Sequence, residues 1–249
     1  MHGSQDAAAD RRSPLALKLA AFVRLKAEEL AQLERLQRRC RRFDAGAELL
    51  HETEVGAKAF ILEEGWAVSY KSLADGGRQV VDFQIPGDFL GLRSLLLRMS
   101  DHSVAAVTEI VACEIDAAEL QNALATAPRL GMALLWAVSR DEAMVVEHLV
   151  GIGRRAPLAR AAHFFVELHQ RLQLAQLATA TSYACPLNQY LLADALGLTA
   201  IHLNRTLRRL RERGLMTLKA GTVTIHDVAG LTALAEFESG YLDQAPPSV

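Results

Sequence analysis

The stretch that most restricts the fold of this chain is ADALGLTAIHLNRTLRRLRERGLM, residues 193–216. It overlaps the end of the segment PLNQYLLADALG, residues 186–197, which has the composition of a short helix. The residues expected on the buried side of that helix are Leu192, Ala195 and Leu196. A tight turn is predicted from Gly197, and Thr199 is a suitable N-cap for a second helix. Two short helices joined by a glycine turn predict a helix-turn-helix unit.

The second helix separates an apolar stripe from a basic face. Leu203, Leu207 and Leu210 recur at i, i+4 and i+7, so they form one buried stripe. The residues on the opposite side include Ile201, His202, Arg205, Arg208 and Arg209. Arginine suits such a face because its planar guanidinium can donate two hydrogen bonds to guanine O6 and N7 or to phosphate oxygens. The coincidence of turn, stripe and basic face favours double-stranded DNA binding over an ordinary solvated surface.

The segment KAGTVTIH, residues 219–226, follows this helix and has β-type composition. Ala220 and Gly221 mark a turn within it. We expect the segment to form the wing of a winged helix, with Lys219 near the DNA backbone.

Charge is unevenly distributed along the 249 residues, although the formal net charge is only −2. Residues 43–128 contain 14 acidic and 5 basic side chains, whereas residues 185–219 contain 6 basic and 2 acidic ones. This asymmetry predicts an acidic module joined to one that binds a polyanion.

The first half of the chain changes from a helical to a β-type pattern. Residues 15–42 have the pattern of an amphipathic helix. The runs AFILEEGWAVSY, RQVVDFQI and SVAAVTEIVACEI then alternate with turn signals between residues 43 and 116. They predict a compact antiparallel β roll or jelly roll.

Helical composition returns after residue 116, with one long helix expected between Pro128 and Pro157. A further helix, LARAAHFFVELHQRLQL, and a polar connection, ATATSYA, lead to the helix-turn-helix. A last helix is expected near residues 231–242, and the tail QAPPSV is expected to be disordered.

The long helix has the spacing of a coiled coil. Its apolar and polar positions at alternate steps of four and three are Leu134, Val138, Asp141, Val145, His148 and Ile152. Neighbouring apolar residues widen this stripe to Leu135, Met144, Val146 and Leu149. We expect the β roll to cover one side and the same helix of a second subunit the other, with Asp141 and His148 fixing the register. The alternative is an ordinary buried core helix.

The cysteines Cys40, Cys113 and Cys185 are odd in number and far apart. This spacing predicts neither a disulfide framework nor a CxxC metal site, and a reducing cytoplasm fits it. The sequence contains no run of about 18 apolar residues, so no membrane span is predicted.

The order of acidic β roll, long helix and winged helix resembles the family of the cyclic-AMP receptor protein and the fumarate and nitrate reduction regulator, the Crp/Fnr family. The landmarks are GRQVVDFQIPGDFLG and LADALGLTAIHLNRTLRRLRERGLM, within a resemblance from about Pro14 to Ala235. It implies an α+β fold with a cyclic-nucleotide-binding-like domain at residues 14–127, a dimerisation helix at 128–155 and a winged helix-turn-helix at 156–244. It also implies a homodimer that binds an inverted repeat and contacts RNA polymerase.

The resemblance assigns roles to individual positions. Arg205 falls on the family's main base-reading arginine. Ala200, Ile201 and His202 fall on variable base-reading positions, where many members carry charged or hydroxyl side chains. The positions at which the family makes mostly phosphate contacts are Arg208, Asn188, Gln189 and Thr199.

The segment that resembles the nucleotide pocket departs from the family pattern. GDFLGLRSLL keeps Gly91 but has Leu92 where the family's ribose-binding glutamate stands. His102 replaces the phosphate-binding arginine, whereas Ser103 is kept. We therefore expect DNA binding without cyclic AMP or cyclic GMP, because losing two charge-assisted partners weakens binding by orders of magnitude. Arg93 or Arg98 is a weaker candidate for another anion, and the effector, if one exists, is not specified.

No cofactor is predicted, because the chain has neither an N-terminal cysteine cluster for an iron–sulfur centre nor a paired His/Cys arrangement typical of haem. A cupin-like β-barrel enzyme is the alternative of a different class. Its metal needs several converging histidines, whereas His51 and His102 stand alone in the roll. Two further alternatives are a regulator gated by a cyclic nucleotide or other small ligand, and a ligand-free dimer controlled by its abundance.

Cys185 lies just before the first helix of the motif, where the chain is expected to pass close to the DNA backbone. Oxidation of its thiol to a sulfenic or sulfinic acid would add negative charge opposite phosphate. The favoured alternative is an inert residue that fills space.

Overall fold

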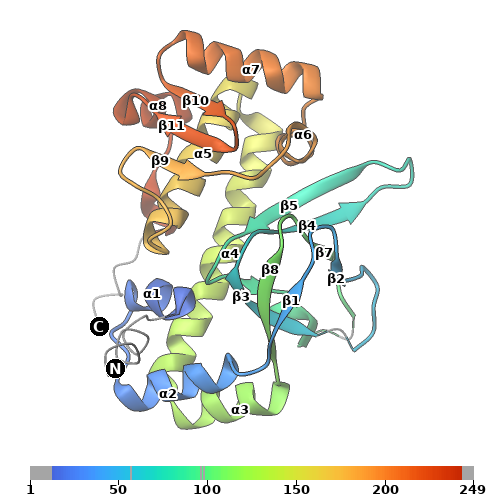
Figure 1. Ribbon diagram of the computed structural model, residues 1–249, viewed down its shortest axis with the longest axis vertical. Helices are drawn as coiled ribbons and strands as arrows, with labels where there is room; N and C mark the ends of the chain where they lie inside the picture. Colours follow the sequence, from blue (N-terminus) through green and yellow to red (C-terminus); the bar gives the residue numbers. More distant parts are fainter. Residues whose placement is uncertain (1–12, 57, 96, 98, 243–249) are drawn as a thin grey trace, which may run out of the picture.

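The computed structural model describes residues 13–56, 58–95, 97 and 99–242. The helix α4 (Pro128–Arg154) runs from the N-terminal helices at one end of the molecule toward the C-terminal half at the other (Figure 1). It begins at Pro128, which tolerates a first-turn position because its nitrogen needs no hydrogen-bond partner there. The prediction of one long helix between the two prolines is confirmed.

The β-type region forms a roll of two four-stranded sheets, with antiparallel pairing throughout. The first sheet has the order β1-β8-β3-β6 and consists of β1 (Cys40–Phe43), β8 (Ile110–Ile115), β3 (Ala59–Glu64) and β6 (Phe89–Leu90). The second has the order β2-β7-β4-β5 and consists of β2 (Glu48–Leu50), β7 (Ser103–Ala106), β4 (Ala67–Ser72) and β5 (Arg78–Gln84). The short helix η1 (Leu92–Leu95) follows β6. The predicted β roll is therefore confirmed.

A tight turn carries the chain from β3 in one sheet to β4 in the other. Gly65 has a φ of 82°, and a Cβ at this position would lie 2.2 Å from the carbonyl oxygen of Glu109. Only glycine fits here, because the turn requires both a left-handed backbone and close approach of another chain segment.

The predicted helix over residues 15–42 is wrong in extent. The structure has two helices, α1 (Pro14–Ala20) and α2 (Ala27–Leu36), and residues 40–43 form β1. Pairing of β1 with β8 outweighs the local helical preference of this charged segment, because strand pairing depends on a distant partner.

Cys40 and Cys113 form a disulfide, which corrects the prediction that the cysteines are unpaired. They are 73 residues apart in sequence, but the antiparallel register of β1 and β8 places them directly opposite each other. Sequence spacing does not reveal a cross-strand pair of this kind, because the pairing is set by the sheet.

The C-terminal third of the chain is a winged helix. Its elements are α5 (Pro157–Leu174), β9 (Ser182–Ala184), α6 (Gln189–Leu196), α7 (Ala200–Glu212), β10 (Met216–Lys219), β11 (Thr222–Ile225), α8 (Val228–Ala235) and η2 (Ser239–Leu242). The strands form a sheet of order β10-β11-β9. The strand β9 lies in the polar connection for which no strand was predicted. The tail QAPPSV lies outside the described residues.

Two hydrophobic clusters join the helices and the winged helix to the roll. One packs α1, α2 and α3 (Ala117–Thr126) with the first half of α4. The other joins β4 and β5 to the winged helix and includes Phe83 and Phe165, both at most 1% exposed. The winged helix therefore packs directly against the roll. Among the described residues, no helix has the length and apolar character needed to cross a membrane.

Candidate nucleic-acid interface and the cavity beside the long helix

The helix-turn-helix has the local geometry that its sequence predicts. Gly197 ends α6 in the left-handed conformation with a φ of 57°, which glycine adopts without steric cost. Thr199 caps α7, its hydroxyl oxygen accepting a hydrogen bond from the backbone nitrogen of His202 at 3.2 Å. Leu203 and Leu210 are fully buried and Leu207 is half-buried, so the leucine stripe packs inward.

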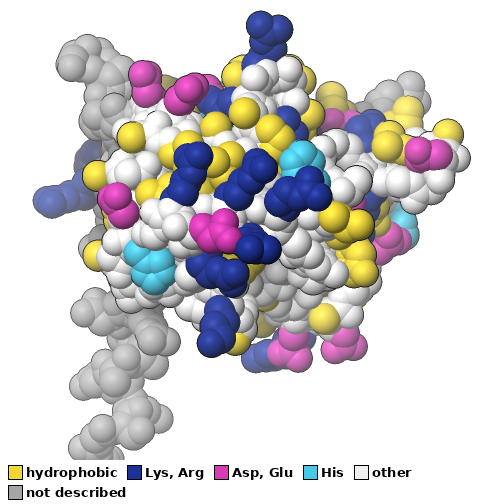
Figure 2. Space-filling view, turned by 90° about the horizontal axis from the view of Figure 1, so that it is seen from above, with side chains coloured by type: hydrophobic (Ala, Val, Ile, Leu, Met, Phe, Trp, Pro, Cys, Tyr) yellow, Lys and Arg dark blue, Asp and Glu magenta, His cyan; other side chains and the backbone are white. Residues whose placement is uncertain are grey.

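The opposite side of α7 is open to solvent. Ile201 is 76% exposed, and Arg205, Arg208 and Arg209 are exposed as well. His202 is half-buried. Figure 2 shows Lys and Arg side chains gathered in a band across the end of the molecule where α7 lies in Figure 1.

The arginines of this face differ in their partners. Arg208 pairs with Glu212 one turn later, at 2.7 Å from Nε to Oε1. Within the described part of the chain, the guanidinium groups of Arg205 and Arg209 make no ion pair or side-chain hydrogen bond. Arg205 is therefore free to bind an external acceptor without first breaking an internal one.

The predicted phosphate-binding residues use their oxygens within the protein. Asn188 caps α6 by accepting from the backbone nitrogens of Tyr190 and Leu191, and Gln189 accepts from the Asn204 amide at 3.0 Å. Both side chains are exposed, and so is Thr199. With their acceptors engaged, the amide N–H groups and the Thr199 hydroxyl are left as donors, which is what a phosphate requires.

The wing turns at Ala220 and Gly221, which have φ values of 49° and 72°. Two successive positive φ values are the signature of a tight hairpin turn that matches strand twist. Lys219 is exposed beside this turn. Lys219 is therefore an exposed cation of the wing, in the same winged helix as the exposed arginines of α7.

Cys185 is fully buried, and its backbone nitrogen donates to the carbonyl oxygen of Gly221. Burial raises the pKa of its thiol to about 11. A protonated, enclosed thiol is a poor nucleophile toward peroxide, because oxidation proceeds through an accessible thiolate. The surroundings of Cys185 favour the space-filling role.

A cavity of about 410 Å³ lies between the roll and α4. It brings together residues predicted for the ligand pocket and residues predicted for the subunit interface. The former are Gly91, Leu92, Arg93 and His102, and the latter are Val138, Asp141 and Val145. The polar side chains of the lining that the sequence did not single out as site residues are Ser69, Asp82, Gln84, Asp88 and Glu142.

The side chains expected to meet a phosphate are turned to other partners. Arg93 pairs with Asp101, at 3.3 Å from Nη1 to Oδ2, and His102 Nδ1 lies 2.7 Å from the same carboxylate. Ser103 accepts a hydrogen bond from the backbone nitrogen of Glu52 at 3.0 Å. Arg98 lies outside the described residues. Arg93 and His102 thus share the Asp101 carboxylate and Ser103 binds the backbone of the roll, so these three described side chains are not free for a phosphate.

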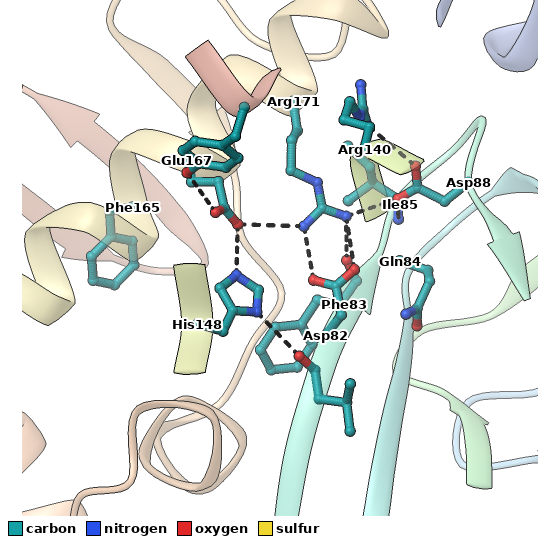
Figure 3. A network of polar contacts seen from close by, with 12 residues as sticks. Asp82, Phe83, Gln84, Ile85, Asp88, Arg140, His148, Phe165, Glu167 and Arg171 are labelled. Carbon is teal, nitrogen blue, oxygen red and sulfur yellow. Dashed lines mark hydrogen bonds and ion pairs between the residues drawn. The ribbon is translucent and has the colours of Figure 1, made fainter. Parts of the chain in front are cut away.

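A buried network of charges lies behind the cavity and joins the roll to the winged helix (Figure 3). Arg171 of α5 donates to both carboxylate oxygens of Asp82, to Asp88 and to the carbonyl oxygen of Phe83, at 2.8–3.2 Å. Lys18 of α1 also pairs with Asp88. Although burial opposes ionisation of Asp88, Lys18, Arg171 and Arg140 hold its pKa well below the usual range.

His148 belongs to this network rather than to the outer face of α4. Its Nε2 lies 2.8 Å from the Glu167 carboxylate and its Nδ1 lies 3.2 Å from the carbonyl oxygen of Val81. Both neighbours accept hydrogen bonds, so the doubly protonated imidazolium fits. Burial alone would lower the pKa of His148, but the Glu167 carboxylate outweighs it and raises the pKa to about 9.

The face of α4 that points away from the roll is apolar and exposed. Leu135 is 58% exposed, Val146 is 52% exposed and Leu149 is 70% exposed. The residues of the predicted interface are divided, because Leu134 is buried against the roll whereas Val145 and Ile152 are 40% and 37% exposed. The exposed stripe is thus centred on Leu135, Val146 and Leu149, three of the residues that were expected only to widen it, whereas the fourth, Met144, is buried.

Two family models match this chain. The model described as a cyclic nucleotide-binding domain matches residues 40–127, which cover the roll and α3. The model described as a Crp-like helix-turn-helix domain matches residues 159–234, which cover most of the winged helix.

Known proteins are similar over most of the chain. The nitrogen fixation regulation protein FixK of Bradyrhizobium diazoefficiens is 30% identical over 211 residues, or 85% of this chain and 87% of that protein. The transcriptional activator protein FnrA of Stutzerimonas stutzeri is 24% identical over 85% of this chain and 86% of that protein. The solved structure of FixK2 from Bradyrhizobium japonicum superposes with a TM-score of 0.70 at 24% identity, covering 78% of this chain and 96% of that one.

Proposed function

Because this chain belongs to the Crp/Fnr family of transcription regulators, we propose that it acts as a homodimer that reads an inverted-repeat promoter site and contacts RNA polymerase. The family membership identifies a DNA-binding transcription regulator and not an enzyme, which resolves the β-barrel enzyme alternative. We propose that it acts on DNA in the cytoplasm. We propose that residues 14–127 form the sensor domain, that residues 128–155 mediate dimerisation and that residues 156–244 bind DNA.

The observation that carries this proposal is the exposed and unpaired guanidinium of Arg205 on α7. A free fork on the outer face of a capped recognition helix can bind guanine O6 and N7 together, which is the commonest specific contact in the major groove. Ala200, Ile201 and His202 lie at the start of the same helix, where side chains reach neighbouring base edges. Arg208, Arg209 and Lys219 supply contacts to phosphate.

We expect Arg205→Ala to lower affinity for the specific site by about 1–3 kcal/mol per half-site while changing affinity for random DNA much less. Arg208→Ala should instead weaken both classes of DNA similarly and reduce the salt dependence of binding. The measurement is fluorescence anisotropy with specific and random duplexes over a range of salt concentrations.

A matched control is Arg41→Ala, which removes an exposed arginine of β1 that pairs with Glu114. It should leave the ratio of specific to random affinity unchanged. An Arg205→Ala protein that kept the ratio of the native protein would contradict the assignment of Arg205 as the base-reading residue.

We further propose that DNA binding does not depend on cyclic AMP or cyclic GMP. Leu92 cannot accept a hydrogen bond from a ribose hydroxyl, and Arg93 and His102 are both engaged by Asp101. A phosphodiester buried without a cation would lose its hydration and gain few compensating ion pairs or hydrogen bonds. Isothermal titration with each nucleotide should show no saturable heat, and DNA affinity should be equal with and without nucleotide. Micromolar nucleotide binding that raised DNA affinity would restore the nucleotide-gated alternative.

A further inference from the structure

The polar lining of the cavity between the roll and α4 is mainly acidic. Among the described residues of the lining, the carboxylates are those of Asp82, Asp88, Asp141 and Glu142, and the one guanidinium is that of Arg93. Asp82 and Asp88 are neutralised from behind by Arg171 and Lys18. Arg93 is paired with Asp101. The lining carboxylates that make no ion pair with any described residue are therefore the two of α4, Asp141 and Glu142.

Asp141 lacks a partner although it is enclosed. Its Oδ1 is buried and makes no hydrogen bond with any residue that the structure describes. Burial raises the pKa of Asp141. The adjacent Arg140 points elsewhere, since its guanidinium lies over the Trp136 ring and 3.9 Å from Asp88. The charges of Lys18 and Arg140 act against this rise, but no described side chain makes an ion pair or hydrogen bond with the buried Oδ1.

Gln84 of β5 adds a second unsatisfied acceptor to the same cavity. The side chain is 8% exposed, and its Oε1 has no hydrogen-bond partner among the described residues. Its orientation is fixed by Ser69, whose hydroxyl donates to the carbonyl oxygen of Asp82 and accepts from Gln84 Nε2 at 2.9 Å. The amide nitrogen is thereby held at Ser69, and the amide oxygen remains an acceptor in the cavity wall.

We propose that this cavity binds a small organic cation with several N–H donors, such as an alkylamine or guanidine, with Asp141 and Glu142 as its countercharges and the Gln84 carbonyl oxygen as a third acceptor. Its volume is within the range of small-molecule sites, and Val138, Val145 and Leu92 provide apolar contacts for an alkyl segment. An anion is disfavoured by the same lining, because it would face two carboxylates that make no ion pair with any described residue.

Such a ligand would lie directly against the connection to the winged helix. Asp82 and Asp88 line the cavity and also hold Arg171 of α5. Occupation of the cavity would therefore alter the ion pairs that set the position of α5. An effect of the cation on DNA binding rests on the proposed function, whereas binding of the cation to the cavity is independent of it.

The first test uses the full-length protein without DNA, so that its outcome is independent of the regulatory function. Isothermal titration at about 0.15 M salt with agmatine, which carries an amine and a guanidinium, should show one saturable site per protomer. Cyclic AMP should give none. Glu142→Gln and Asp141→Asn should each weaken agmatine binding about tenfold to a hundredfold, because each removes one charged acceptor while keeping the size of the side chain.

The matched control is Glu119→Gln, which removes an acidic side chain of α3 outside the cavity lining and should leave agmatine binding unchanged. If Asp141→Asn fails to fold, the Glu142→Gln protein still decides the outcome, because Glu142 is exposed. The absence of saturable binding by both agmatine and spermidine would overturn the proposal. Binding that survived Glu142→Gln and Asp141→Asn equally would place the cation elsewhere and overturn it as well.

Discussion

His148 shows how the chemistry of a single residue depends on what surrounds it. In the sequence it occupies a coiled-coil position, but in the structure its ring is held between Glu167 and the carbonyl oxygen of Val81. Its pKa is raised to about 9, whereas the pKa of Glu167, although burial opposes ionisation, is lowered to about 2 by His148. The pair is therefore fully charged across the neutral range, and it joins α4 to α5.

The His148 pair predicts a specific pH dependence of stability. A histidine whose pKa is raised on folding stabilises the protein fully below its unfolded pKa of about 6.5, and this contribution is lost as pH rises through 9. His148→Gln should lower the free energy of unfolding at pH 6 by on the order of 3 kcal/mol, and the two curves should converge toward pH 9.

Urea unfolding between pH 5.5 and 9 measures this difference. His51→Gln is the control, because His51 is 62% exposed and should give a curve parallel to that of the native protein. A constant gap between native and His148→Gln proteins over the whole range would show that His148 is not the group that titrates.

At the scale of the elements, α5 is anchored to the roll by one arginine. Arg171 is 3% exposed and reaches across to Asp82 and Asp88, which belong to β5 and to the loop that follows it. The contact is made by one residue of the winged helix and several groups of the roll, so it fixes the position of α5 as well as contributing to stability.

Arg171→Met should destabilise the protein by about 3–5 kcal/mol, because it leaves Asp82 and Asp88 buried with fewer countercharges. Thermal unfolding followed by circular dichroism measures the loss. Arg41→Met, which breaks an exposed pair with Glu114, should change stability by no more than about 0.5 kcal/mol. Equal effects of the two substitutions would contradict the anchoring role of Arg171.

At the scale of the whole molecule, α4 has two apolar faces, and the described residues cover only one of them. Leu130, Ala133 and Ala137 are buried against the roll and the N-terminal helices, whereas Leu135 and Leu149 remain 58% and 70% exposed on the other side. An exposed apolar stripe along a helix is typical of a surface that a partner covers, and the same helix of a second subunit fits it by symmetry.

Leu149→Glu should convert the proposed dimer to a monomer and reduce affinity for an inverted repeat by at least tenfold, because one protomer contacts only one half-site. Light scattering gives the mass and anisotropy the affinity. Leu73→Glu is the control, since Leu73 is 52% exposed in the turn after β4. A Leu149→Glu protein that remained dimeric at micromolar concentration would exclude this face as the subunit interface.

Elements whose signals are local could be predicted from the order of residues alone. The glycine turn, the Thr199 cap and the leucine stripe of α7 depend on residues a few positions apart, so the helix-turn-helix could be predicted directly. The alternation of the β runs and the prolines that bound α4 are local in the same sense, and they predicted the roll and the long helix.

Contacts between groups far apart in the chain depend on how the elements pack, and they could not be predicted from local patterns. The Cys40–Cys113 disulfide depends on the register of β1 and β8, and the strand formed by residues 40–43 depends on the same pairing. The contact of Arg171 with Asp82 spans 89 residues, and the acceptors of the cavity come from β5 and α4 together. Periodicity shows which side of an element is apolar, but it does not show which buried polar group will lie opposite, because that depends on how the elements pack.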